Sequence, residues 1–355
     1  MPRFWKQLAI AKNWPILAAI VVLCLLGIVS IWAESPTHGK NQLLFACMGL
    51  GVLVATQCVS YTRIGRWAWG LYILSLLLLI YTVVPFTHAA QGDTGLFKVP
   101  YKGGSYAWIN LKFATFQPAE LTKIAFCMVL AHYLRFRSNY RTLMGLIPPF
   151  LLAMVPLLLI LGQPDLGTAL TFIPALFVML FVAGAKLKHL LAIVGLSVIL
   201  APAVWLSGSD TPLFRHTPAL VKDYQRKRVM AMFSDDPMVM RETGYQQAHA
   251  LMAFGSGGWT GRGAMNIPVG RLVPEAHNDM IFALIGEQFG LVGAAVVLGA
   301  YLVLCATGLE IAASTKDSFG RLLAVGIVSL LAGQALLNLL VCVRLMPVTG
   351  VTLPF

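Results

Sequence analysis

The chain has 355 residues, of which 58% are hydrophobic and only 11% are charged. Soluble domains usually carry about 25% charged residues, so the composition excludes a soluble globular protein and indicates one that lies in lipid. The net charge is +12, but the basic residues lie between apolar runs rather than in one patch. That distribution is typical of the positive-inside rule and makes nucleic acid the weaker explanation of the charge.

Nine apolar segments are candidates to cross a bilayer, whose hydrocarbon core of roughly 30 Å requires about 20 residues in a helix. They are residues 15–32, 43–61, 67–86, 119–134, 143–161, 166–183, 189–207, 280–304 and 322–345. The first is interpreted as a retained helix, because Trp32-Ala33-Glu34 is a poor signal-peptide cleavage site. The predicted fold class is therefore all-α, a polytopic helical bundle that forms one membrane domain over residues 1–355.

The basic residues of the short loops predict the orientation of these helices. With the N-terminus in the cytoplasm, every inner loop contains Lys or Arg, whereas the outer connections at 34–40 and 162–165 are poor in both. Residues 208–278 then form a large extracytoplasmic loop, which is long enough to escape the positive-inside rule. Its basic residues predict a site for an anionic headgroup or substrate, and they are Arg215, Lys222, Arg226, Lys227, Arg228, Arg241, Arg262 and Arg271.

Charged residues also stand at the starts of two predicted membrane helices. A charge buried within the membrane costs roughly 2.5–3.5 kcal/mol, so charges that approach the spans are informative. Glu120 and Lys123 follow Pro118 and lie three residues apart, so they share a helix face and can form an ion pair. Asp165 precedes the segment 166–183, where it can cap free amides. For each of these residues, a purely structural role and a place in a functional cavity both stay open.

The segment 255–263 is rich in glycine and includes Gly257, Gly258 and Arg262. Unobstructed backbone N–H groups can surround phosphate oxygens, and the arginine adds positive charge. The segment lacks the Gly-Lys-Ser/Thr ending of a P-loop, so a flexible turn is the alternative.

His277-Asn278-Asp279 leads directly into the apolar segment 280–304. A carboxylate at the mouth of a membrane helix is only partly solvated, and this can raise its pKa toward that of a useful general base. The alternative is an N-cap formed by Asn278 or Asp279, with His277 as a neighbour. A zinc site is not predicted, because His277 and Asp279 lack a third and a fourth ligand at a recognisable spacing.

Taken in order, five stretches give the chain a family resemblance. They are Gln-Pro-Ala-Glu-Leu-Thr-Lys at 117–123, Gln-Pro-Asp-Leu-Gly-Thr-Ala at 163–169, Gly-Tyr-Gln at 244–246, Pro-Glu-Ala-His-Asn-Asp-Met-Ile-Phe-Ala-Leu-Ile-Gly-Glu at 274–287, and Pro-Val-Thr-Gly-Val-Thr-Leu-Pro-Phe at 347–355. Over nearly its whole length, the chain resembles the SEDS family (shape, elongation, division and sporulation), to which RodA and FtsW belong.

The resemblance implies a ten-helix protein of the bacterial inner membrane that polymerises lipid II into glycan strands on the outer face, with inversion and release of undecaprenyl pyrophosphate. It implies that Asp279 is the catalytic base, and that Glu120, Lys123, Asp165, His277, Gly257, Gly258 and Arg262 bind substrate or support the cavity. It also implies a class B penicillin-binding protein as partner, and a divalent cation, Mg²⁺ or Mn²⁺, that screens the pyrophosphate. No organic cofactor is expected.

Some residues depart from the family pattern. Ala107 stands where an arginine is usual and Asn278 where a threonine is usual, but Asp279 is kept. Family sequences also continue beyond Leu-Pro-Phe with a further motif and the last helix, so we expect this chain to be truncated or partial. Between the two types of member, we slightly prefer the elongation-type (RodA-like) reading to the division-type (FtsW-like) one. A lipid II flippase and a non-catalytic scaffold that activates a penicillin-binding protein are the alternative functions.

Overall fold

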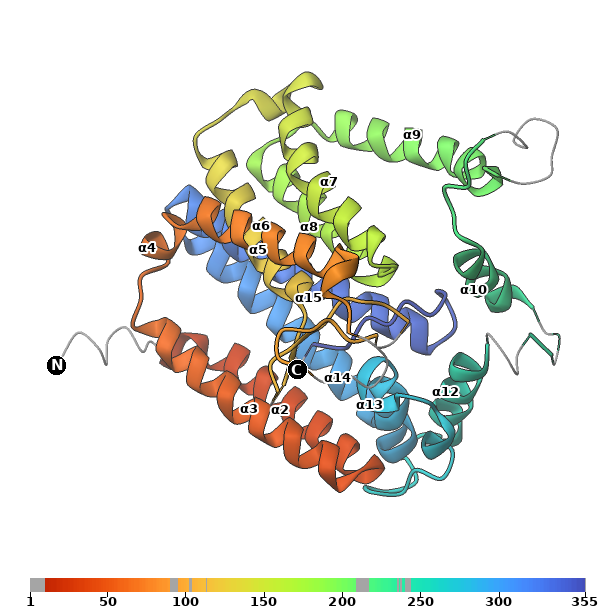
Figure 1. The fold of residues 1–355 in the computed structure, drawn as a ribbon. Helices are drawn as coiled ribbons and strands as arrows, with labels where there is room; N and C mark the ends of the chain where they lie inside the picture. The colour runs from red at the N-terminus through yellow and green to blue at the C-terminus, as the bar shows by residue number, and fades with distance from the viewer. Residues whose placement is uncertain are drawn as a thin grey trace.

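The computed structural model describes residues 10–89, 95–101, 104–112, 114–208, 217–234, 236, 238–239 and 244–354. Helices dominate these residues (Figure 1), and the described strands are the two-residue pair β1 (Ile109–Asn110) and β2 (Thr115–Phe116), which run antiparallel. The predicted all-α bundle is confirmed.

The chain begins with a hairpin of two long helices, α2 (Ile10–Glu34) and α3 (Pro36–Gln57), which lie side by side (Figure 1). Pro36 suits the first turn of α3, where its missing N–H would have no helical partner. Gly39 allows the close approach of the two helices, because a Cβ there would lie 2.9 Å from Cα of Trp32. The short helix α4 (Tyr61–Gly65) follows the hairpin.

A central bundle contains α5 (Ala68–Val83), α6 (Pro118–Arg135), α7 (Ile147–Gly162), α8 (Leu166–Ala183) and α15 (Ser318–Cys342). Its core is a cluster of fully buried side chains that includes Phe126, Leu130, Phe172, Met179 and Phe319. The 3₁₀ turns η1 (Pro85–Thr87), η2 (Asn139–Arg141) and η3 (Met144–Leu146) lie in its connections, and α9 (Leu187–Leu206) extends away from it (Figure 1).

The helix α14 (Ile281–Ser314) packs against α2, α12 and α15 around a second buried cluster. It is ten residues longer at its C-terminal end than the predicted segment 280–304, and it is broken at Gly290, where φ is 63° and ψ is −157°. The sequence analysis did not predict this break. Glycine is suited to it, because such a positive φ is strained for every residue with a Cβ.

The predicted loop 208–278 contains regular structure of its own. Its helices are α10 (Asp223–Phe233), α12 (Tyr245–Ser256), the 3₁₀ turn η4 (Gly270–Leu272) and α13 (Ala276–Asp279). Of these, α12 packs on α14. The described part of the segment is therefore partly helical, and α12 joins it to the bundle.

Each of the nine predicted spans coincides with a helix. Among the described residues, seven helices are long and apolar enough to cross a membrane, whereas α5 has only 16 residues and α6 carries Glu120, Lys123 and Arg135. The loops predicted to share a side also contact one another: Arg135 pairs with Asp317 at 3.3 Å, and Glu34 approaches His277. The protein is a multi-pass membrane protein.

Candidate functional site

A cavity of about 690 Å³ lies among α6, α8, α10, α13, α15 and the C-terminal segment 348–352. It brings together four residues that the sequence analysis selected: Glu120, Lys123, Asp165 and Asp279. These residues come from three separate motifs that span 160 residues of the sequence, and the fold brings them together around one cavity.

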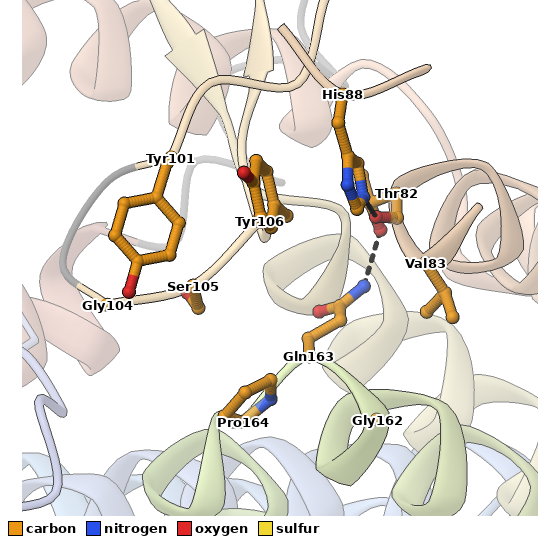
Figure 2. Close-up of a pocket in the computed structure, with 10 residues that line it drawn as sticks. All are labelled: Thr82, Val83, His88, Tyr101, Gly104, Ser105, Tyr106, Gly162, Gln163 and Pro164. Atoms are coloured by element: carbon orange, nitrogen blue, oxygen red, sulfur yellow. Dashed lines mark hydrogen bonds between the residues drawn. The ribbon is translucent and has the colours of Figure 1, made fainter. Parts of the chain in front are cut away.

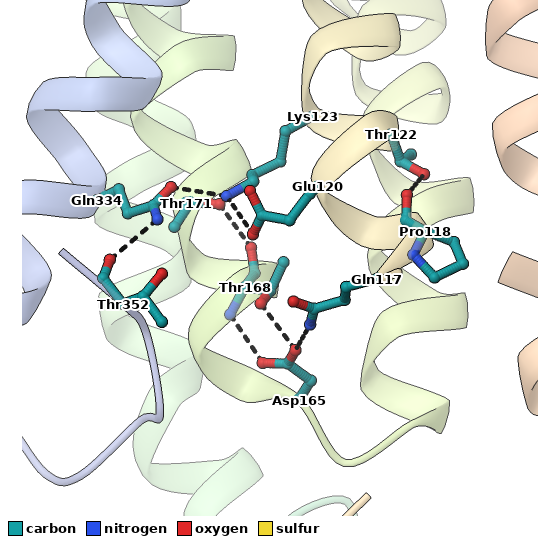
Figure 3. Close-up of polar contacts among 10 residues, drawn as sticks. All are labelled: Gln117, Pro118, Glu120, Thr122, Lys123, Asp165, Thr168, Thr171, Gln334 and Thr352. Atoms are coloured by element: carbon teal, nitrogen blue, oxygen red, sulfur yellow. Dashed lines mark hydrogen bonds and ion pairs between the residues drawn. The ribbon is translucent and has the colours of Figure 1, made fainter. Parts of the chain in front are cut away.

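On one wall of the cavity, Lys123 forms the predicted ion pair with Glu120 (Figure 3). Its Nζ lies 2.8 Å from Oε1 of Glu120 and donates a hydrogen bond of 2.6 Å to Oε1 of Gln334 on α15. Gln334 in turn donates from Nε2 to the carbonyl oxygen of Thr352 at 3.0 Å. Lys123 is only 5% exposed, so this pairing compensates for a buried charge and ties α6 to α15 and to the C-terminal segment.

Asp165 caps α8, as the sequence analysis predicted, and it also lines the cavity. Its Oδ1 accepts from the backbone N–H of Thr168 at 3.0 Å, and its Oδ2 accepts from the Thr168 hydroxyl at 2.7 Å and from Nε2 of Gln117 at 3.0 Å (Figure 3). Burial raises the pKa of Asp165, and the two hydrogen bonds from Thr168 oppose that rise. The carboxylate is therefore fully engaged in holding α8 beside α6.

Asp279 lies at the C-terminal end of α13 and is 9% exposed. Nε2 of Gln246 donates to its Oδ1 at 2.9 Å, and Nδ2 of Asn338 donates to its carbonyl oxygen at 2.7 Å. Burial raises the pKa of Asp279 to about 6, and the charge of Glu275 adds to the rise. The backbone N–H of Asp279, the Gln246 side chain and the charge of Arg228 oppose it. A carboxylate with this pKa is deprotonated at neutral pH, yet it binds a proton better than an exposed aspartate does.

The N-cap alternative for this segment is wrong. Met280 occupies the N-cap position of α14 and no side chain caps the helix, while Asn278 donates from Nδ2 to Oε2 of Glu275 at 2.7 Å. Glu275 itself has a left-handed backbone, with φ 51° and ψ 33°. Such strain persists only where the surrounding structure enforces it, and it is frequent at functional sites.

Two residues of the predicted basic cluster, Lys222 and Arg228, line the cavity. Arg228 donates to the carbonyl oxygen of Val348 at 3.1 Å, which holds its guanidinium at the cavity wall. Arg226 instead donates to the carbonyl oxygen of Ser207. Arg215 and Arg241 lie outside the described residues. Three cationic side chains line the cavity: Lys123, Lys222 and Arg228. Four acidic side chains also line it, and they are Glu120, Asp165, Glu275 and Asp279.

The glycine-rich segment does not line this cavity. It packs against the break in α14 instead: N–H of Arg262 and of Gly263 donate to the carbonyls of Glu287 and Gln288. Across the break, N–H of Leu291 donates to Gly258. A Cβ at Gly257 would meet the carbonyl oxygen of Gly286 at 2.0 Å, so packing alone accounts for that glycine. Phosphate binding by Gly257, Gly258 and Arg262 stays a prediction.

His277 lies two residues before Asp279 and faces the α2–α3 hairpin rather than the cavity. Its Nδ1 is 3.1 Å from Oε1 of Glu34, its Nε2 is 3.7 Å from Oε2 of Glu275, and its ring centre is 4.1 Å from that of His38. Of the described residues, Glu34, His38 and His277 form the one group of three that could share a metal ion. Sequence spacing could not reveal this group, because Glu34 and His38 are more than 200 residues from His277.

A side chamber of about 340 Å³ shares Tyr101, Gly104, Ser105 and Pro164 with the main cavity (Figure 2). Two further aromatic rings, His88 and Tyr106, stack at 3.8 Å in its wall, and the buried Gln163 also lines it. Residues 87–118 are rich in aromatic residues and glycine, but the sequence analysis selected none of these side chains.

Three polar side chains around the cavity were also missed. Gln334 and Asn338 lie four residues apart in the apolar helix α15, and this spacing on one helix face could have revealed them. Asn338 donates both to Asp279 and to the carbonyl oxygen of Val351. Gln246 belongs to the Gly-Tyr-Gln motif, but its contact with Asp279 spans 33 residues and has no periodic signal.

The chain matches the profile of the FtsW/RodA/SpoVE family, described as cell cycle proteins, over residues 7–355. It is 33% identical to the probable peptidoglycan glycosyltransferase FtsW of Trichlorobacter lovleyi, over 96% of this chain and 86% of that one. It is 31% identical to the peptidoglycan glycosyltransferase MrdB of Escherichia coli K12, over 99% and 89%. A solved chain from a study of polymerisation and crosslinking by a peptidoglycan synthase complex matches with a TM-score of 0.76 and 29% identity, over 97% and 91%.

Proposed function

The chain belongs to the FtsW/RodA/SpoVE family of cell cycle proteins, and we propose that it polymerises lipid II into glycan strands with Asp279 as the general base. The family and the names of its relatives make it a peptidoglycan glycosyltransferase. The residue roles, the substrate and the sidedness that follow are the parts that we propose.

The observation that carries the proposal is the composition of the main cavity. Asp279, Lys222 and Arg228 line the same cavity, and so does the Glu120–Lys123 pair. A glycosyl transfer from a pyrophosphate needs a base on one side of the reacting carbon and positive charge where the leaving group departs. The cavity offers both.

The proposed reaction is a single displacement. The 4-hydroxyl oxygen of the acceptor sugar attacks the anomeric carbon of the donor while Asp279 accepts its proton. The bond from that carbon to the pyrophosphate oxygen breaks, and its electron pair leaves with undecaprenyl pyrophosphate. Attack from the face opposite the leaving group inverts the configuration at the anomeric carbon.

The cationic side chains act on the leaving group. Arg228 is held at the cavity wall by Val348, and Lys222 lies at the start of α10. Preorganised positive charge in an enclosed site stabilises the negative charge that develops on the pyrophosphate. Lys123 is already neutralised by Glu120, so we assign it support of the cavity rather than contact with the phosphates.

The cavity is compatible with the divalent cation that the resemblance implies. Mg²⁺ is usually held by one or two carboxylates together with substrate phosphates, and Glu275 and Asp279 both line the cavity, close enough for the charge of Glu275 to raise the pKa of Asp279. Together with the substrate phosphates, Glu275 would hold Mg²⁺ or Mn²⁺, which would supply charge that screens the pyrophosphate and leave Asp279 free to accept the proton.

We place the cavity on the extracytoplasmic face of the bacterial cytoplasmic membrane, with the N-terminus in the cytoplasm. The basic inner loops and the contact of Glu34 with His277, both in predicted outer segments, support this orientation. The likeness to a chain studied in a peptidoglycan synthase complex supports a class B penicillin-binding protein as partner. RodA-like rather than FtsW-like membership stays a prediction.

Polymerisation of purified lipid II tests the proposal. The wild-type protein, with and without its transpeptidase partner, should form glycan polymer, and Asp279→Ala should form none although it folds and binds the partner as the wild type does. A parallel reaction with a chelator of divalent cations tests the need for the cation.

Two outcomes would contradict the proposal. Normal polymer formation by Asp279→Ala would remove this residue from the chemistry. A wild-type protein that yields polymer under no condition, yet moves lipid II across vesicle membranes or only stimulates its partner, would favour the flippase or the scaffold.

A further inference from the structure

We propose that Glu34, His38 and His277 form a binding site for a transition-metal ion, Zn²⁺ in the first place, that fastens the α2–α3 hairpin to the helix that carries Asp279. One ligand atom from each side chain lies within 4.8 Å of the others. The site is separate from the cavity that would hold Mg²⁺ or Mn²⁺, since none of the three residues lines that cavity. It does not rest on the proposed glycosyl transfer.

The geometry of His277 fits a metal ligand. Nδ1 of His277 and Oε1 of Glu34 are 3.1 Å apart, and two ligands at about 2.0–2.2 Å from one zinc ion lie at about this separation from each other. Nε2 of His277 lies 3.7 Å from Oε2 of Glu275, which is too far for a hydrogen bond. The geometry therefore assigns Nδ1, the nitrogen beside Glu34, to the metal.

Glu34 supplies a second, independent observation. Its side chain is 19% exposed, and its Oε2 atom is buried without a hydrogen-bond partner among the described residues. A buried carboxylate oxygen without a partner is costly. A cation bound between Glu34 and His277 would compensate for that cost.

The backbone holds the ligands in place before any ion binds. Glu34 is the last residue of α2 and His38 lies in the first turn of α3, so one tight connection carries both. Gly39 allows this connection to close against Trp32. His277 lies in α13, which contacts α2. The site therefore joins two segments that are fixed by separate packing.

The donor set selects the kind of metal. Two imidazoles and one carboxylate suit Zn²⁺ and its transition-metal neighbours, whereas Mg²⁺ prefers oxygen ligands. Three protein ligands leave a fourth position for water in a tetrahedral zinc site. His38 is exposed, so the site is open on one side, as entry of an ion requires.

Metal binding by the purified full-length protein tests the site. The protein should be purified through a tag without histidine, stripped with a chelator, and titrated with Zn²⁺ in a calorimeter; bound zinc is then counted by elemental analysis after dialysis. We expect one zinc ion per chain. Co²⁺ in the same site should give the visible absorption bands of a four-coordinate ion, and excess Mg²⁺ should not displace either metal.

His38→Gln is the sharpest variant, because His38 is exposed and its loss leaves the buried packing intact. It should weaken zinc binding by more than about tenfold, since even outer partners of metal ligands typically contribute 10–100-fold. Glu34→Gln and His277→Gln should do the same. His249→Gln is the matched control: His249 bonds to the carbonyl oxygen of Tyr245 within α12 and lies outside the group.

Binding of zinc should also slow backbone hydrogen exchange in residues 276–279, and His38→Gln should abolish that effect. The proposal is overturned if the wild-type protein retains no stoichiometric zinc, or if His38→Gln and His277→Gln bind zinc as tightly as the His249→Gln control. In either case, Glu34 and His277 form an ordinary ion pair.

Discussion

Two carboxylates that line the cavity, Asp165 and Asp279, differ in how many hydrogen bonds their oxygens accept. Both oxygens of Asp165 accept hydrogen bonds, which come from Thr168 and Gln117. The Asp279 carboxylate accepts from Gln246 at one oxygen and stands beside the strained Glu275. Burial raises the pKa of both, but for Asp279 it outweighs the opposing hydrogen bonds far enough to raise the pKa to about 6.

This difference separates a structural carboxylate from a chemical one. A group whose lone pairs are all occupied holds its neighbours in place and gains little from binding a proton. A group that is desolvated and only partly compensated accepts a proton readily. The Glu120–Lys123 pair belongs with Asp165, because its charge is neutralised within the wall of the cavity.

The largest expected effect comes from the same change at both carboxylates. Asp279→Asn keeps the shape of the side chain but removes the base, and a general base typically contributes 10²–10⁴-fold in rate. Asp165→Asn should lower the rate by less than about tenfold, because asparagine caps a helix as well as aspartate does. Rates of lipid II polymerisation by the two folded variants measure the contrast. Equal losses would show that the two carboxylates do not differ in role.

The dependence of the rate on pH should follow Asp279. A base acts only when deprotonated, so a pKa of about 6 places the loss of activity below about pH 6, with roughly a tenfold fall per further pH unit. An exposed aspartate would place that loss near pH 4. Initial rates between about pH 4.5 and about pH 8 span the expected transition and measure the pH profile. Asp165→Asn should not shift this profile. Full activity at pH 5 would contradict the assignment.

The smallest effect concerns stability. Lys123→Met keeps the volume of the stem but leaves Oε1 of the buried Gln334 without its donor. An unsatisfied buried polar group costs roughly 1–3 kcal/mol, so the thermal midpoint of the detergent-solubilised protein should fall. Lys123→Met combined with Gln334→Leu should recover part of the loss, since replacing both partners by apolar groups is close to neutral. A double variant less stable than the single one would place the role of Lys123 elsewhere.

The parts of the fold that the sequence predicted well are those with local signals. The boundaries of α8 agree with the predicted segment 166–183, because Asp165 caps one end and Gly184, at φ 105°, closes the other. The Glu120–Lys123 pair followed from a spacing of three residues. In both cases the interacting groups lie within one turn of a helix, where periodicity is informative.

The rest depended on contacts between distant segments. The glycine-rich segment looks like a phosphate loop because its packing partner, the break at Gly290, is 30 residues away and has no sequence signature. The alternative of an N-cap at Asn278 or Asp279 was wrong, because Met280 has a non-helical backbone and occupies the N-cap position of α14. Glu34 and His38 meet His277 only because the first hairpin packs beside α13.

The break in α14 has a mechanical consequence for a protein embedded in lipid. Transmembrane helices adapt to the thickness of the bilayer by tilting. The helical hydrogen bonds of α14 are interrupted at Gly290. Backbone groups of four residues form hydrogen bonds to the helix on both sides of this break, and these residues are Gly258, Trp259, Arg262 and Gly263. Residues 291–314 therefore need not continue the axis of residues 281–289, while the hydrogen bonds to segment 258–263 keep the two halves together. Asp279 lies just ahead of the shorter half, whose direction is set by that segment as well as by the rest of α14.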